Sequence, residues 1–453
     1  MDAFDIDDRA VTVLRKKYHG NSRVRIAQKD TLLDEELTLF CAAGGRYDKI
    51  VGNPPYGAWQ EYDRRALLKK KYPGQYVRET YSLFLLRCVS LLKTGGRLSF
   101  IVPDTFLFLN MHTKLREFLL TSTKISEILT FPSKFFPGVS FGYSKLAIVT
   151  LERAARGEAL KNSVRMVRGF RSAADFVHAS DSAGMPAHLE SHLLNQQEIL
   201  QGESCRFLVA DRGTAAVLQD APVRIGDVAR VVTGFCSGDN RRFVRALDDS
   251  VKGSKNYEKI VPDRVFSCTS LDGIETEDEG YVPYVKNVAG TRYCRTRDEW
   301  FVRWDRKALD FYRTSPKTRF QNAAFYFRRG IGIPMVKSTA TRAILLEDRL
   351  FDQSVVGIFP HDMKKLHYLL AVMNSDAVNR LIHVINPTAN NSANYIKQIP
   401  YMEPERPVLE EIGDRVRAVL DCVRLGKSGE AERLHGEINA MIGQVYGSLQ
   451  PQL

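Results

Sequence analysis

The chain has 453 residues, of which 44% are hydrophobic and 26% charged, so it has the composition of a globular protein with room for two or three domains. No apolar run is as long as a membrane span, and the amino-terminal stretch MDAFDIDDRA is acidic where a secretory signal is basic, so we expect a cytoplasmic protein that does not enter a membrane. The formal net charge of +12 suits a polyanionic partner, although many basic proteins have none.

The seven cysteines form no CxxC pair, and their number is odd. This pattern favours reduced thiols over a disulfide framework or a zinc site. We therefore predict no metal site.

Strand and helix patterns alternate along residues 1–153. Residues 3–6, 23–27, 47–53, 97–103 and 143–153 are strand-like, whereas residues 7–18 and 80–93 have helical spacing, and a Gly-Gly turn is expected at residues 95–96. This order predicts an α/β fold with a doubly wound, Rossmann-like sheet.

The stretch DKIVGNPPYGAW ends a strand with two prolines. Proline donates no backbone N–H and pushes the preceding residue out of the helical region, so Asn53 and Pro54 are expected to be extended and stiff. The Asn53 amide oxygen and the Pro54 carbonyl can then accept hydrogen bonds from one amino group. Pro55 is followed by Tyr56, whose ring can stack on a planar base. A simple proline-rich turn with a packed tyrosine is the alternative.

Three successive expected strand ends carry Asp5, Asp30 and Asn53. Ligands of open α/β sheets bind at the carboxyl ends of strands, where Asp5 can bind ribose hydroxyls and Asp30 can accept from an adenine amino group. Each aspartate alone has a plainer interpretation as a helix N-cap or a loop residue.

These segments resemble the adenine-specific (N6) DNA methyltransferases of the gamma class, TaqI-like and found in fused type II restriction-modification enzymes. FDIDDRAV resembles the family's ribose-binding motif, AQKD its cofactor-adenine motif and DKIVGNPPYG its catalytic motif. Residues 91–107 resemble the strand motif that follows the catalytic motif, and FFPGVSFGYSKLAIVTLE resembles the motif that supplies a second aromatic residue. The resemblance implies S-adenosylmethionine as cofactor, held by Asp5, Asp30 and Asn53. It also implies a flipped target adenine stacked between Tyr56 and Phe136. Phe135 is the alternative match to this second aromatic residue, and a phenylalanine buried in the core is the plainer interpretation. The implied function is site-specific methylation of adenine N6 in a restriction-modification or phage-defence system.

The sequence departs from the family pattern at its start. A first strand and a Gly-rich loop precede the ribose-binding motif in the family, whereas only MDAF precedes Asp5 here. We therefore expect a sheet without its first strand, and the sequence leaves open whether this chain is active alone. The implied partners are double-stranded DNA and either a restriction endonuclease or a chain that supplies the Gly-rich loop.

We expect four regions: a methyltransferase domain (1–153), a connecting region (154–222), an α+β target-recognition domain (223–407) and carboxy-terminal helices (408–453). The third region mixes basic and aromatic residues, which suits phosphates and base edges. We predict that Arg241, Arg242, Arg328 and Arg329 bind DNA; ordinary surface charges are the alternative.

Two other functions remain open. The missing loop favours a catalytically incomplete DNA-binding subunit or remnant. A protein glutamine methyltransferase also uses an NPPY loop, but such enzymes resemble only the first third of this chain.

Overall fold

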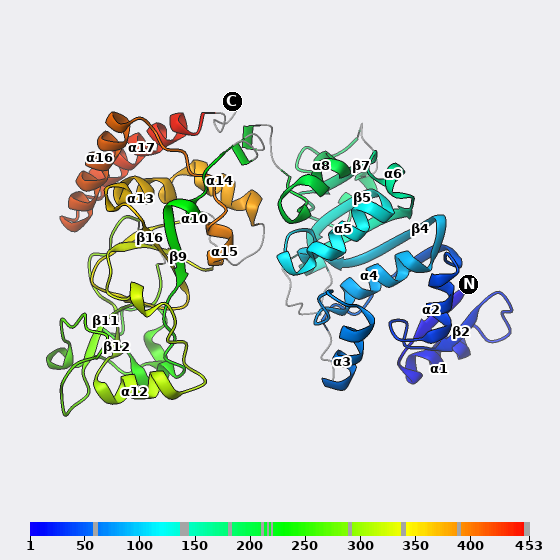
Figure 1. Ribbon diagram of the computed structural model, residues 1–453, viewed down its shortest axis with the longest axis horizontal. Helices are drawn as coiled ribbons and strands as arrows, with labels where there is room; N and C mark the ends of the chain where they lie inside the picture. Colours follow the sequence, from blue (N-terminus) through cyan, green and yellow to red (C-terminus); the bar gives the residue numbers. More distant parts are fainter. Residues whose placement is uncertain are drawn as a thin grey trace. The chain divides into compact units, whose positions relative to one another are not determined.

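The computed structural model describes residues 1–57, 62–135, 145–179, 184–209, 213–214, 217–218, 221–288, 292–336, 341–386 and 391–447. The chain divides into two compact units, Met1–Val209 and Ala210–Leu453 (Figure 1). Within the described ranges, no helix is long and apolar enough to span a membrane.

A six-stranded mixed sheet forms the centre of the first unit. Its strands, in spatial order, are β3 (Tyr47–Gly52), β4 (Leu92–Pro103), β6 (Lys145–Arg153), β5 (Thr123–Pro132), β7 (Ser163–Arg168) and β8 (Glu190–Asn195). β3 and β4 are parallel, whereas β6 is antiparallel to both β4 and β5. Apolar residues of α4 (Thr80–Leu91) and α5 (Thr113–Ser122) pack on the sheet in one core, as Figure 1 shows. The expected α/β fold is therefore confirmed.

The first two strands form a sheet of their own. β1 (Asp2–Asp5) pairs in parallel with β2 (Arg25–Gln28), and the connecting α1 (Asp8–Lys17) contacts both. Asp7 is the N-cap of α1, and its carboxylate accepts from the Arg9 N–H. The last turn of α1 holds three basic residues, which suit the negative end of the helix dipole. α2 (Glu35–Ala42) and α3 (Tyr62–Lys71) complete this part of the unit.

The expected Gly-Gly turn lies inside β4 rather than before it. Tyr47 of β3 pairs with Leu92, but Lys49 pairs with Arg97, so the residues between Leu92 and Arg97 bulge out of the ladder. Gly95 has a φ of +80°, a backbone conformation that favours glycine. The glycine turn was therefore predicted at the right residues, but the strand begins before the turn and not after it.

The region 154–222, expected to be a connection, contributes strands to the sheet. β7 is parallel to β5, and β8 is antiparallel to β7. β7 buries Val164, Met166 and Val167, whereas β8, at the sheet edge, buries none of its residues. An edge strand shows only a weak apolar pattern, which explains why β8 was missed.

The second unit contains two four-stranded sheets. One has the order β10 (Val244–Ala246), β12 (Trp300–Arg303), β11 (Tyr281–Val285), β15 (Leu350–Phe351); the other has the order β14 (Ile344–Leu346), β13 (Gly330–Pro334), β16 (Val355–Pro360), β9 (Ala229–Thr233). α12 (Arg306–Thr314) packs its buried face into an aromatic core with Phe235 and Trp304. Strands and helices thus share this unit, which is the expected α+β organisation.

The carboxy-terminal helices α16 (Arg406–Arg424) and α17 (Ser428–Val445) belong to the second unit. They share one core with β9, β13, β16, α13 (Leu366–Asn374) and α14 (Asp376–Ile385). The buried Tyr446 hydroxyl, just after α17, donates to the Pro400 carbonyl at 2.9 Å. Residues 408–453 are therefore packed as part of the same body as residues 223–407.

The other α-helices in the described ranges are short: α6 (Arg156–Ala159), α7 (Asp175–His178), α8 (Gln196–Gln201), α10 (Ile225–Val228), α11 (Asn240–Phe243) and α15 (Ala393–Ile396).

Candidate active site

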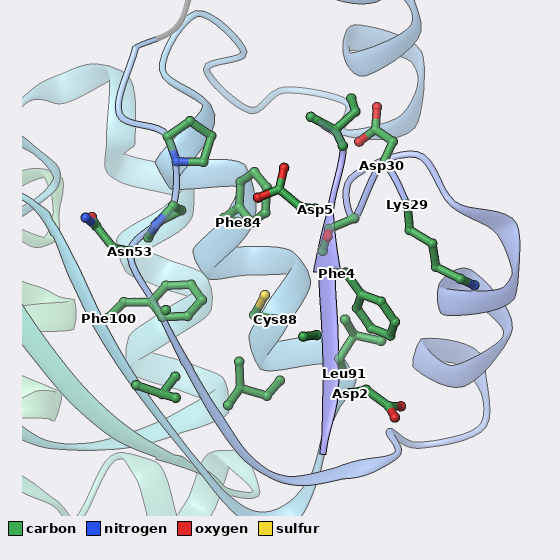
Figure 2. A pocket seen from close by; sticks show the side chains of 18 of the residues that line it. Asp2, Phe4, Asp5, Lys29, Asp30, Asn53, Phe84, Cys88, Leu91 and Phe100 are labelled. Atoms are coloured by element: carbon green, nitrogen blue, oxygen red, sulfur yellow. The ribbon is translucent and has the colours of Figure 1, made fainter. Parts of the chain in front are cut away.

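A cavity of about 1070 Å³ lies between the β1–β2 sheet and the free edge of β3. Residues of β1 and β3 line it, together with Lys29, Asp30 and Thr31 after β2 and part of α4 (Figure 2). Ligand pockets usually measure about 300–1,000 Å³, so this cavity is slightly larger than most of them.

The structure brings the three predicted strand-end residues together. Asp5, Asp30 and Asn53 all line the cavity; in Figure 2, Asp5 and Asp30 lie near each other, and Asn53 lies apart from them on the β3 side. They come from β1, the end of β2 and the end of β3, whose carboxyl ends meet there as expected of an α/β sheet.

Asp5 is not the N-cap of the following helix, because Asp7 has that role. One Asp5 carboxylate oxygen accepts from the Asp7 N–H at 2.9 Å, which fixes the side chain at the strand end. A carboxylate offers about four acceptor sites, so this bond leaves Asp5 able to accept from hydroxyl groups of a ligand.

Asp30 is held by two partners. Its carboxylate accepts from the Leu32 N–H at 3.0 Å and pairs with the Arg64 guanidinium at 3.1 Å. Arg64 also lines the cavity but was not predicted, because only the docking of α3 brings it to this strand end. An adenine amino group would therefore share Asp30 with a cation.

The loop Asn53–Tyr56 follows β3 directly. Asn53 is exposed and Pro54 is buried, and both line the cavity. The Thr80 hydroxyl, at the first turn of α4, donates to the Pro55 carbonyl at 2.7 Å. Thr80 is buried, so the loop is anchored to the interior by a residue that the sequence did not single out.

Tyr56 is half-buried and packs against two hydrophobic clusters of the first unit. Burial raises the pKa of its hydroxyl, so the ring stays neutral at physiological pH. Phe136, the predicted second stacking residue, lies outside the described residues. The alternative match, Phe135, packs in the same cluster as Tyr56 and stacks on Phe131 with ring centroids 5.9 Å apart.

Asp104 follows β4, the strand next to β3, and was not predicted as a site residue. Burial raises the pKa of its carboxyl to about 6, although the positive charge of Lys145 opposes the shift.

The four predicted DNA-binding arginines lie in the second unit and are all exposed. Arg241 and Arg242 belong to α11, and the Arg242 guanidinium lies 4.8 Å from the Phe243 ring centroid. Arg328 and Arg329 precede β13, and Arg329 pairs with Glu347 at 3.0 Å. Their contact with DNA remains a prediction.

The described residues contain no group of three or more His, Cys, Asp or Glu side chains placed to hold a metal ion.

Comparison with known proteins extends this description. Residues 4–136 match the family model of the Eco57I restriction-modification methylases. The type II restriction enzyme and methyltransferase RM.Eco57I of Escherichia coli is 31% identical over 124 residues, which are 25% of this chain and 12% of that protein. The adenine-specific methyltransferase BrxX of Escherichia coli O9:H4 (strain HS) is 21% identical over 370 residues, which are 79% of this chain and 28% of that protein. The chain thus spans less than a third of the length of either relative.

A solved structure shares the fold over almost the whole chain. The type IIL restriction-modification enzyme MmeI, solved in complex with DNA, has a TM-score of 0.58 at 13% identity, covering 99% of this chain and 61% of that chain. The resemblance of the amino-terminal motifs to adenine-specific restriction-modification methyltransferases is confirmed for residues 4–136.

Proposed function

We propose that this chain is the catalytic and DNA-recognising part of a site-specific DNA methyltransferase that acts on the N6 amino group of adenine, in a restriction-modification or phage-defence system. One observation carries the proposal: Asn53 and Pro54, on a loop fixed by Thr80, line the same cavity as Asp5 and Asp30. The match of residues 4–136 to restriction-modification methylases supports it.

The lining residues Asp5 and Asp30 fit S-adenosylmethionine. Asp5 offers carboxylate oxygens to the ribose hydroxyls, and Asp30 offers acceptors to the adenine of the cofactor. Bound there, S-adenosylmethionine supplies an electrophilic methyl group. The chain itself has to hold the acceptor nitrogen in line with it.

The Asn53 amide oxygen and the Pro54 carbonyl accept the two hydrogens of the target amino group. These bonds draw the nitrogen towards tetrahedral geometry and free its lone pair for attack. Catalysis then rests on positioning and electrostatics. Methyl transfer leaves a cationic nitrogen, which then releases one proton to water, so no side chain is required as general base.

The target base has to leave the duplex, which costs a few kcal/mol in lost stacking and pairing. Tyr56 offers its ring face to offset that cost, with Phe136 proposed on the opposite side. The second unit supplies exposed arginines, of which Arg241, Arg242, Arg328 and Arg329 are proposed to contact DNA. A restriction endonuclease, or a chain that supplies a Gly-rich loop, is proposed as a further partner.

A second candidate is a catalytically incomplete DNA-binding subunit. It is favoured by the separation of the β1–β2 sheet from β3, because a cofactor site between two unjoined sheets is only partly held in place.

The test is transfer of labelled methyl from millimolar S-adenosylmethionine to duplex DNA. We expect incorporation with the parent chain and none with Asn53→Ala, while DNA binding in a gel-shift assay is unchanged. Asn53→Gln, which keeps the amide but moves it by one carbon, should also lose most activity. Parent-level transfer by Asn53→Ala would exclude the assigned role. DNA binding without transfer by the parent would favour the second candidate, and labelling of protein glutamine would favour the glutamine methyltransferase.

A further inference from the structure

A buried hydrogen-bond network includes both chain neighbours of Thr80. The His112 Nε2 lies 2.9 Å from the Glu79 carboxylate and 3.1 Å from the Tyr81 hydroxyl, which lies 2.8 Å from the Thr105 Oγ1. Tyr81 and His112 are almost completely buried. Polar groups buried in this way are costly unless they are bonded to one another, so the network fixes the positions of its members.

The Glu79 carboxylate decides the hydrogen-bond roles of the other groups. With Glu79 ionised, an imidazole nitrogen without a proton would place two acceptors 2.9 Å apart, so the His112 Nε2 carries a proton and donates it to Glu79. The Tyr81 hydroxyl then cannot donate to that nitrogen. It donates to the Thr105 oxygen instead, so each donor of the network has an acceptor.

The network reaches the loops after two neighbouring strands. Thr105 follows β4, and the Asn53–Tyr56 loop follows β3, which is parallel to β4. Both loops bond to the first turn of α4, because Thr80 holds the Pro55 carbonyl at 2.7 Å and Tyr81 holds Thr105. The first turn of α4 therefore joins the two loops.

The start of α4 lacks an ordinary cap. Glu79 is its N-cap residue, but the Glu79 side chain makes no capping hydrogen bond. A capping side chain normally steadies the first turn by accepting from its N–H groups. Here the carboxylate bonds to His112 instead, so a tertiary contact steadies the turn that carries Thr80.

His112 is itself held firmly by the rest of the first unit. In the segment before it, the Leu109 carbonyl accepts from the fully buried Arg116 guanidinium at 2.9 Å. The Asn110 side-chain oxygen accepts from Arg206 at 2.7 Å. Both arginines carry a permanent charge and make strong hydrogen bonds, so His112 is a fixed point for α4.

We infer that Glu79, Tyr81 and His112 are positioning residues of the candidate active site. They fix the first turn of α4, and through Thr80 they fix the loop that carries the two proposed acceptors of the target amino group. The inference rests on the proposed function for its effect on methyl transfer, whereas the fixing of α4 can be measured without any activity.

The test compares two substitutions of His112. Glutamine carries an amide N–H close to the position of the imidazole Nε2 and can still donate to Glu79, whereas leucine fills similar space and cannot. Gln196→Leu is the matched control, because Gln196 is also fully buried and accepts from the Ile125 N–H at 2.8 Å. Ile125 is near the start of β5, which runs parallel to β4, so this control lies at the sheet edge opposite to the candidate site.

Hydrogen exchange measures the fixing of α4. The amides of Ser82, Leu83 and Phe84 lie in its first turn. His112→Leu should speed their exchange by about tenfold relative to amides of β6, whereas His112→Gln and Gln196→Leu should not.

Methyl transfer measures the consequence for the site. His112→Leu should lower kcat by about tenfold with little change in KM for DNA or cofactor, and His112→Gln should restore most of the rate. Glu79→Leu should match His112→Leu because both lose the same bond, and Tyr81→Phe should lower kcat by about threefold. Adding Thr80→Val to His112→Leu should cost little more, because both changes act on one contact.

The two measurements separate failure of the inference from failure of the proposed function. Faster exchange in α4 with no methyl transfer by the parent would overturn the function and support the fixing of α4. Unchanged exchange in His112→Leu would overturn the inference, as would equal loss of kcat in His112→Gln, equal loss in Gln196→Leu, or fully additive losses with Thr80→Val.

Discussion

At the scale of single residues, the candidate site is an acceptor pair on a rigid loop. The two prolines limit the backbone, and the buried Thr80 hydroxyl holds the Pro55 carbonyl at 2.7 Å. The convergence of Asp5, Asp30 and Asn53 could be predicted because each follows a recognisable strand. Arg64 and Thr80 could not, because each reaches the site through the docking of a helix, for which a single sequence carries no signal.

Thr80 is expected to act as a positioning residue. Thr80→Val keeps the shape of the side chain but loses the hydrogen bond, which is worth about 1 kcal/mol, so kcat should fall by about fivefold to tenfold with KM little changed. Thr80→Ser keeps the hydroxyl and should restore most of the rate. Equal rates for the valine variant and the parent, or equal losses for both variants, would exclude this role.

Tyr56 is expected to act through its ring and not its hydroxyl. Tyr56→Phe should keep activity, whereas Tyr56→Leu, which fills similar apolar space without a ring face, should lose about tenfold or more, since stacking on a base is worth about 1–3 kcal/mol. A target adenine placed in a mismatch costs less to flip and should recover part of the loss. A leucine variant as active as the parent on paired DNA would show that Tyr56 is only a core residue.

Asp104 should make the first unit less stable as the pH rises. Its folded pKa of about 6 lies above the usual aspartate value of 3.8, so the folded state binds the proton more tightly. The contribution of this group to the free energy of unfolding is fully present below pH 4 and is lost between about pH 4 and 6. The shift in pKa sets an upper limit of about 3 kcal/mol on this loss, and partial exposure of the side chain makes the loss smaller. Asp104→Asn should therefore slow hydrogen exchange in β4 at pH 7.5 more than at pH 4. Asp48→Asn, at a carboxylate whose side chain is 78% exposed, is the control and should change little. An equal effect of Asp104→Asn at both pH values would contradict this assignment.

At the scale of elements, strands with apolar residues and clear ends were predictable, including β1, β2, β3 and β6. The β5 and β7 strands were missed although each lies between two other strands of the sheet. The β8 strand was missed because its edge position leaves none of its residues buried. The start of β4 was placed too late because a bulge holds the Gly-Gly turn within the strand. Long-range pairing, which a single sequence does not display, decided each of these cases.

The two arginines before β13 should differ in their effect on DNA binding. Arg329 pairs with Glu347, which also pairs with Arg424 at 3.2 Å, so its charge is partly balanced within the protein. If the pair of arginines contacts phosphates, Arg328→Gln should reduce the log-log salt slope by close to 0.9, and Arg329→Gln by less. Arg406→Gln, at an exposed arginine of α16 paired with Glu410, is the control. Slopes unchanged in both variants before β13 would remove these residues from the DNA contact.

At the scale of the whole molecule, the chain divides into its two compact units between Val209 and Ala210, within the region expected to be a connection. Removal of residues 223–407 alone would separate α16 and α17 from the core that they share with β9, β13 and β16. Division of the chain after Val209 leaves both compact units intact. Residues 210–453 should keep salt-dependent DNA binding and sequence preference, whereas residues 1–209 should fold and lose both. Titration of each fragment at two salt concentrations measures this, and affinity of residues 210–453 that ignored salt would contradict it.

Asp5 and Asp30 are proposed to hold only the nucleoside end of S-adenosylmethionine, so calorimetry should find weak or no binding of the cofactor to this chain. Tight binding would show that the residues present suffice to hold the cofactor.

The central claim is that adenine N6 receives the methyl group at the Asn53 loop. The most direct measurement is mass spectrometry of nucleosides from duplex DNA incubated with the chain and millimolar S-adenosylmethionine, beside Asn53→Ala. We predict N6-methyladenine with the parent chain and none with the variant. Methylated cytosine, or equal N6-methyladenine from both proteins, would contradict the account.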